Sequence, residues 1–188
     1  MKILLTAFEA FADDEINYSK EVLKKITNIQ GLVKEVLPVE YLGSFKKLQS
    51  LIEKEQPNKI ILLGEARKYK SVGFEVIAIN EFGEKPDSSG YIHTKRKIIA
   101  TGDDGLFSTL DYAVFAKELT NKNVNFFRSF SAGTYVCNAV LYQCLHYLKT
   151  NRLNIKCGFF HVPSDETQST DSIASGLDAY LLALLKAK

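Results

Sequence analysis

Short, almost wholly apolar runs recur along the chain and alternate with longer segments of helical periodicity. Runs at residues 2–6, 59–63 and 156–162 are typical of strands buried on both faces of a sheet. Further strands are expected at 32–39, 74–80, 98–101 and 124–129. Apolar spacing predicts helices at 19–27, from 43 to the breaker at 57–58, and at 108–119, 135–149 and 170–188. The alternation predicts an α/β fold, with a mostly parallel sheet and helices on both faces.

One long segment follows neither pattern. Residues 81–97 are polar, contain glycine, proline and serine, and end in three consecutive basic residues. Long irregular segments of this kind are often functional, so we expect an irregular flap here.

The composition is that of a folded globular protein. With 188 residues, 46% of them hydrophobic and 24% charged, the chain predicts one domain over residues 1–188. A net charge of +2 without a basic stripe argues against nucleic-acid binding, and no apolar run is long enough for a membrane-spanning helix. The apolar N-terminus loosely resembles a signal peptide, but Glu9 interrupts it, so we expect a buried first strand.

The chain has three cysteines, Cys137, Cys144 and Cys157. Their odd number and the lack of a Cys-x-x-Cys pair argue against a zinc site. They favour a reduced, cytoplasmic compartment, in which one thiol is free for chemistry.

Candidate chemistry gathers where predicted strands end, which is where ligands bind in open α/β sheets. Phe8 and Phe11 follow the first strand, and Cys137 follows the strand at 124–129. With Thr134 as the helix N-cap, Cys137 would be the third residue of a helix, whose N-terminal partial charge favours a thiolate. The alternative is a buried structural cysteine.

His161 ends the strand at 156–162 and follows Cys137 across one helix. A βα crossover would bring both residues to the same edge of the sheet, although a lone histidine there could also be a satisfied buried residue. Glu75 lies in an otherwise apolar strand and needs a partner unless it faces outward from an edge strand. Cysteine, histidine and a carboxylate together form a known nucleophilic arrangement.

Four segments resemble the pyrrolidone-carboxylate peptidase family, whose members are also called pyroglutamyl peptidase I. Residues 131–138 (SAGTYVCN) are similar to its catalytic-cysteine motif, and residues 158–163 (GFFHVP) to its Gly-Phe-x-His-Val-Pro motif. Residues 75–80 (EVIAIN) and 6–11 (TAFEAF) resemble its Glu-x-Val-Ala-Ile-Asn strand and its Thr-Gly-Phe-x-Pro-Phe loop. Order and spacing agree, so the resemblance covers nearly the whole chain.

The resemblance implies a three-layer α/β/α sandwich around a twisted, mostly parallel sheet. It implies a cysteine peptidase that removes N-terminal 5-oxoproline from pyroglutamylated peptides through a thioester, without metal or cofactor. Family members often form dimers or tetramers. Carried over, Cys137 is the nucleophile, His161 the acid/base and Glu75 the orienting carboxylate. The lactam-binding residues are Phe8 and Phe11, with Asn17 supporting their loop.

The loops at 7–18, 64–69 and 81–90 depart from the family pattern, for example at Ala12 and Asp13. The family's Gly-Gln-Ala-Gly-Gly-Arg turn is GEARKY at 64–69, so Glu65 replaces the pocket glutamine. Glu65 either adds an uncompensated charge to the lactam pocket and weakens binding, or points to solvent. The family's oxyanion-site arginine has no counterpart, and Lys85 is a candidate replacement.

Two alternative functions follow from these departures. One is a cysteine hydrolase of the same scaffold that acts on another cyclic or blocked amide, which Glu65 favours. The other is a catalytically quiet binding or assembly protein, which the altered loops favour and the intact Cys, His and Glu set opposes.

Overall fold

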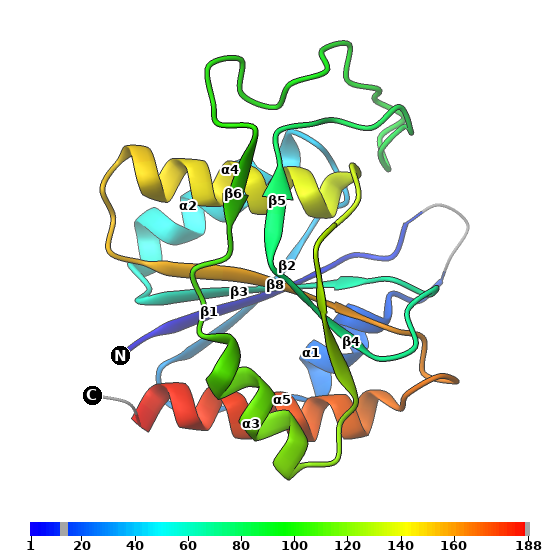
Figure 1. Cartoon of the computed structure of the whole chain (residues 1–188), viewed down its shortest axis with the longest axis vertical. Coiled ribbons are helices and arrows are strands. Elements are labelled where there is room, and N and C mark those ends of the chain that lie inside the picture. Colours follow the sequence, from blue (N-terminus) through cyan, green and yellow to red (C-terminus); the bar gives the residue numbers. More distant parts are fainter. Residues whose placement is uncertain (12–14, 187–188) are drawn as a thin grey trace.

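The computed structural model describes residues 1–11 and 15–186, so the departures at residues 12–13 lie outside the described residues. A six-stranded sheet forms its centre, in the order β2-β1-β3-β8-β4-β7 (Figure 1). Strands β2, β1, β3 and β8 are parallel, β4 is antiparallel to β8, and β7 is parallel to β4. Their bounds are β1 Ile3–Phe8, β2 Leu32–Leu37, β3 Lys59–Glu65, β4 Val72–Glu75, β7 Phe126–Ser129 and β8 Lys156–Val162.

Helices cover both faces of this sheet (Figure 1). On one face lie α1 Tyr18–Lys25, α3 Tyr112–Asn121 and α5 Thr170–Lys186; on the other lie α2 Gly43–Glu55 and α4 Val136–Thr150. Each face carries its own buried apolar cluster, because successive strand residues point to opposite faces. The three-layer α/β/α sandwich with a mostly parallel sheet is therefore confirmed.

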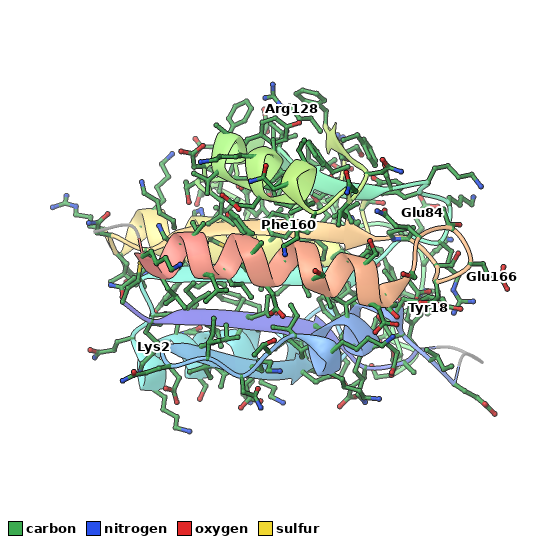
Figure 2. The ribbon with its side chains drawn as sticks, turned by 90° about the horizontal axis from the view of Figure 1, so that it is seen from below. Lys2, Tyr18, Glu84, Arg128, Phe160 and Glu166 are labelled. Atoms are coloured by element: carbon green, nitrogen blue, oxygen red, sulfur yellow. The ribbon has the colours of Figure 1, made fainter. Side chains whose placement is uncertain are left out.

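The layer of α1, α3 and α5 packs around aromatic rings. Figure 2 views the molecule from the side of this layer and labels Phe160 of β8. Its ring centroid lies 4.6 Å from that of Phe115 in α3 and 5.7 Å from that of Tyr180 in α5. Phe160 thus joins β8 to two helices and fixes the strand that carries His161 near its end.

The expected strand at 74–80 is two separate strands. β4 ends at Glu75, and β5 (Ile77–Ile79) leaves the sheet to pair antiparallel with β6 (Gly105–Phe107). This two-stranded sheet packs on α4 (Figure 1). The expectation of one continuous strand is wrong, because Val76 donates its N–H to Ser129 at the end of β7 and the chain then turns away.

The strand expected at 98–101 is also wrong. These residues form turns, held where the buried Asn80 side chain accepts from the Ile99 N–H and donates to the Ile99 and Gly102 carbonyls. The apolar pair Ile98 and Ile99 packs on the cluster below α4 instead of extending a sheet. As expected, residues 81–97 contain no helix or strand.

Among the residues that the structure describes, no helix combines the length and the apolar character needed to cross a membrane.

Candidate active site

Cys137 lies at the start of α4, above the carboxyl end of β3. The helix begins at Val136 with Tyr135 as N-cap, so Cys137 is its second residue and not the third, as expected with Thr134 as the cap. A Cβ atom on Gly64 of β3 would lie 3.0 Å from the Cys137 Sγ and 2.5 Å from the Phe159 ring. Position 64 is therefore a glycine because the Phe159 ring, and next to it the thiol, closely approach the β3 backbone.

His161 is the neighbour of that glycine in the sheet, since Gly64 and His161 are register partners. The imidazole is buried, and its Nδ1 lies 2.7 Å from the Glu75 Oε1. This arrangement leaves Nε2 for an interaction with Cys137, which is among the groups that raise the pKa of the ring. Burial works against the imidazolium, but the charge and hydrogen bonds of Cys137 and Glu75 outweigh it and raise the pKa of His161 to about 9.

Glu75 ends β4 and is fully buried, so the alternative of an outward-facing edge charge is wrong. Its Oε1 accepts from His161 and, at 3.2 Å, from the Tyr69 hydroxyl. Its Oε2 has no hydrogen-bond partner among the described residues. Burial makes the ionised form of this carboxylate unfavourable. The two hydrogen bonds that Oε1 accepts therefore supply much of the stabilisation of the charged form.

The expected βα crossover does not explain why these residues meet. β7, which precedes α4, runs antiparallel to β8, and its last residue Ser129 pairs with Glu75 beside the middle of β8. Residues 130–135 then lead to the start of α4 above β3. The two residues are together as expected, but a loop places Cys137 and the end of a parallel strand places His161.

A small apolar recess opens beside Cys137, with a volume of about 40 Å³. It contains all four residues expected to bind substrate, and the structure adds Val39 and Tyr135 to its wall. Its lining residues are Phe8, Phe11, Asn17, Val39, Glu65, Tyr135 and Cys137.

Asn17 holds the wall of this recess together. Its Nδ2 donates to the Glu9 carbonyl at 3.0 Å, and its Oδ1 accepts from the Ser19 N–H at 3.0 Å as the N-cap of α1. Since Phe8 and Phe11 flank Glu9 in the chain, Asn17 fixes the segment that carries both rings.

Comparison with known proteins agrees with this geometry. The family model described as "Pyroglutamyl peptidase" matches residues 1–184. The chain is 40% identical to a pyrrolidone-carboxylate peptidase of Oceanobacillus iheyensis over 93% of this chain and 90% of the relative, and 35% identical to one of Thermococcus kodakarensis over 91% and 85%. The chain belongs to the pyroglutamyl peptidase family. The crystal structure of Bacillus amyloliquefaciens pyroglutamyl peptidase I superposes with a TM-score of 0.89 at 26% identity, covering 95% of this chain and 94% of that one.

In this member of the pyroglutamyl peptidase family, both expectations for Glu65 need correction. Its side chain is only 2% exposed, so it does not point to solvent. Nor is its charge uncompensated: one carboxylate oxygen accepts from the Arg67 guanidinium, and the other accepts from the Tyr18 N–H at 2.6 Å. Glu65 therefore joins the turn after β3 to the first turn of α1.

A wider groove of about 660 Å³ includes His161 and shares Phe11 and Glu65 with the recess. Lys85 lines this groove, but within the described residues its ammonium group makes no hydrogen bond or ion pair with Cys137, His161 or Glu75 that would identify it as the oxyanion group. The groove is lined by Phe11, Glu65, Ala66, Arg67, Lys68, Tyr69, Lys85, Ser131, Ala132, Gly133 and His161.

Sequence reasoning missed three residues around this site. Tyr135 lines the recess and caps α4. The fully buried Asn138 binds both backbone groups of Ile79, which fixes β5 to α4, and its place directly after the cysteine was a usable signal. Tyr69 donates a hydrogen bond to Glu75 and packs against the His161 ring, and nothing in the apolar pattern around Tyr69 indicated these contacts.

The described residues contain no group of three or more His, Cys, Asp or Glu side chains arranged to hold a metal ion. The other two cysteines, Cys144 and Cys157, are free and buried, with sulfur atoms 3.4 Å apart. Burial and the neighbouring Cys144 raise the pKa of the Cys157 thiol, which makes Cys157 a poor nucleophile.

Proposed function

We propose that the protein is a cysteine peptidase that removes N-terminal pyroglutamyl residues from peptides, with Cys137 as nucleophile, His161 as acid/base and Glu75 as orienting carboxylate. The observation that carries the proposal is the half-buried thiol of Cys137 between the His161–Glu75 pair and an apolar recess. Membership of the pyroglutamyl peptidase family supports the substrate class.

The reaction follows from the order of these groups. His161 takes the Cys137 proton through Nε2, and the thiolate attacks the carbonyl carbon of the N-terminal residue. Backbone N–H groups at the start of α4 stabilise the oxyanion that forms. The imidazolium then protonates the leaving amine as the C–N bond breaks, and water hydrolyses the thioester with His161 again as base.

The recess supports selection of a neutral ring. A pyroglutamyl residue has no ammonium group. Its lactam can therefore enter the recess lined by Phe8, Phe11 and Val39 without burying an unsolvated charge. Asn17 and Glu65 supply polar groups at the edge of that wall. An ordinary charged N-terminus would lose its hydration there, which is unfavourable.

We also propose that the protein works in the cytoplasm as a homo-oligomer, a dimer or a tetramer. The cytoplasmic location is supported by three free thiols, one of them the proposed nucleophile, which requires a reducing compartment. Size-exclusion chromatography with light scattering measures the assembly.

Hydrolysis of pyroglutamyl-aminomethylcoumarin, compared with a panel of other N-blocked amides, tests the activity. Faster turnover of the pyroglutamyl amide, abolished in Cys137→Ser, is the expected result. Preference for another cyclic or blocked amide would replace the substrate class, and no turnover of any amide would indicate a binding or assembly protein.

A further inference from the structure

Tyr69 lies in the turn between β3 and β4, in the segment whose sequence departs from the family pattern. Its N–H donates to the Ala66 carbonyl at 2.8 Å, which closes the turn and directs the side chain over the sheet. The ring occupies the space above Gly73, where a Cβ atom would lie 2.6 Å from the Tyr69 Cε2. The missing side chain at Gly73 thus makes room for Tyr69.

The Tyr69 ring contacts His161, the proposed acid/base, from the side of β4. The other sheet neighbour of His161, Gly64, lies on β3. Gly73 is the antiparallel register partner of His161, so the phenol ring over Gly73 stands beside the imidazole. The two rings meet edge to face, with centroids 5.7 Å apart at 77°, and Phe127 of β7 backs the phenol ring at 4.9 Å. This packing restricts rotation of the imidazole.

The hydroxyl reaches the carboxylate that orients His161. It lies 3.2 Å from the Glu75 Oε1, 3.1 Å from the Ser129 Oγ and 3.4 Å from the Ser131 carbonyl. The carboxylate and the Ser131 carbonyl only accept, and the phenol has a single proton; the shorter distance and the negative charge favour donation to Glu75, and Ser129 can then donate to the phenol oxygen. Burial chiefly raises the pKa of Tyr69, opposed by the Ser129 hydrogen bond and assisted by the charge of Glu75, so the phenol keeps its proton.

We propose that Tyr69 is a positioning residue for catalysis, which holds the buried Glu75 carboxylate through its O–H and thereby orients His161. The proposal rests on the proposed roles of Glu75 and His161. Its physical basis is that a buried carboxylate with one unpartnered oxygen depends on the donors at the other, of which Tyr69 is one of two. The titratable groups that interact with this cluster are Glu75 from β4, His161 from β8 and Cys137 from α4. The groove beside Tyr69 and His161 is also lined by the charged residues Glu65, Arg67, Lys68 and Lys85.

Tyr69→Phe tests the hydroxyl and keeps the ring over Gly73. We expect kcat for a pyroglutamyl amide to fall about tenfold, as for loss of one hydrogen bond to a charged group, with KM changed less than about threefold. The alkaline limb of the kcat/KM profile should move to higher pH, because the positive end of the O–H dipole no longer opposes the imidazolium. A residue that only packs would leave this limb in place when its ring is retained.

Tyr112→Phe is the matched control, since it removes a phenol hydroxyl from α3 on the opposite face of the sheet. It should leave both kcat and the pH profile unchanged. Ser129→Ala removes the second neighbour of the phenol and should have a smaller effect, which is not additive with Tyr69→Phe because both act through Glu75.

The pH dependence of Cys137 alkylation by iodoacetamide measures the protonation of the same cluster in the absence of a substrate. The inflection that reports loss of the imidazolium proton should also move to higher pH in Tyr69→Phe, with alkylated sites counted by mass spectrometry. A folded Tyr69→Phe protein with the wild-type alkylation profile would overturn the role of Tyr69. If the wild type cleaves no pyroglutamyl amide, the proposed function fails, and the alkylation profile still decides on Tyr69.

Discussion

The proposed catalytic cluster of Cys137, His161 and Glu75 and the recess beside it are held in different ways. His161 and Glu75 lie on adjacent strands of one sheet, and Cys137 lies over the neighbouring strand against Gly64. The recess wall instead depends on a loop fixed by Asn17 and on a turn fixed by Glu65 with Arg67 and Tyr18.

This difference separates chemistry from recognition. Strand register fixes the spacing of Glu75 and His161, so a change at Glu65 leaves that spacing intact. The loop before α4 places Cys137, and among the residues of the turn at 64–69 it is Tyr69 that reaches Glu75. The turn at 64–69 shows the contrast within six residues. Gly64 lies within β3 and admits the thiol, whereas Glu65 at the end of the strand forms an ion pair with Arg67.

The largest expected effect is at the nucleophile. Cys137→Ser should lower kcat by a factor on the order of 10³ or more, because a hydroxyl does not form the imidazolium–anion pair that the thiol forms. Cys144→Ser and Cys157→Ser should keep substantial activity, since both are buried away from the recess. Steady-state hydrolysis of a pyroglutamyl amide measures all three, and equal loss in each would refute the assignment of Cys137.

The next effect separates the two strand residues. His161→Ala should reduce kcat by roughly 10²–10⁴-fold because both proton transfers use the imidazole. Glu75→Gln should cost less, since its amide oxygen can still accept from Nδ1. The same assay on both variants provides the comparison, and a greater loss in Glu75→Gln would show that the carboxylate does more than orient.

Gly64→Ala tests whether strand packing sets the position of the thiol. The added Cβ would overlap the Phe159 ring at 2.5 Å and approach the Cys137 Sγ at 3.0 Å. We expect kcat to fall tenfold or more and stability to fall by about 1–3 kcal/mol from overpacking. Chemical denaturation and kinetics measure the two effects. Wild-type activity in Gly64→Ala would mean that α4 moves to accommodate the added methyl group and that strand packing does not set the position of the thiol.

The pH profile should reflect the imidazolium–thiolate pair. The pKa of His161 is raised from its usual value of 6.5 to about 9. Its charged form, with the stability that it contributes, is therefore fully present below about pH 6.5 and is lost as the pH rises through about 9. Activity should decline above pH 9 in the wild type, and the limb should move to lower pH in Glu75→Gln. An unchanged alkaline limb in Glu75→Gln would contradict the interaction between Glu75 and His161.

The smallest effect is expected in the recess. Arg67→Met leaves the Glu65 charge without its ion-pair partner and should raise KM several-fold with little change in kcat. Glu65→Gln in the same chain removes that charge and should restore KM, while Glu65→Gln alone should change KM by less than Arg67→Met does. Steady-state kinetics of the three variants decide this, and a kcat effect larger than the KM effect would break the separation of recognition from chemistry.

Much of the fold follows from the chain's own pattern. The apolar runs at β1, β3 and β8 and the helical spacing of α2, α4 and α5 report local burial, which is a property of neighbouring residues. The motifs around Cys137, His161 and Glu75 also indicated three residues that the structure brings together, because each carries a polar group in an apolar context.

The rest depends on contacts between distant segments. The reversal of β7, the break after Glu75 and the turns at 98–101 are set by partners that periodicity does not specify. The same holds in part for Glu65: Arg67 lies only two residues away in the chain, but the Tyr18 N–H that binds the other carboxylate oxygen is 47 residues away. Local patterns thus determined which residues are buried and which carry candidate chemistry. Only the tertiary structure decided which groups bind the buried polar and charged side chains, because most of these hydrogen bonds join elements that are far apart in the chain.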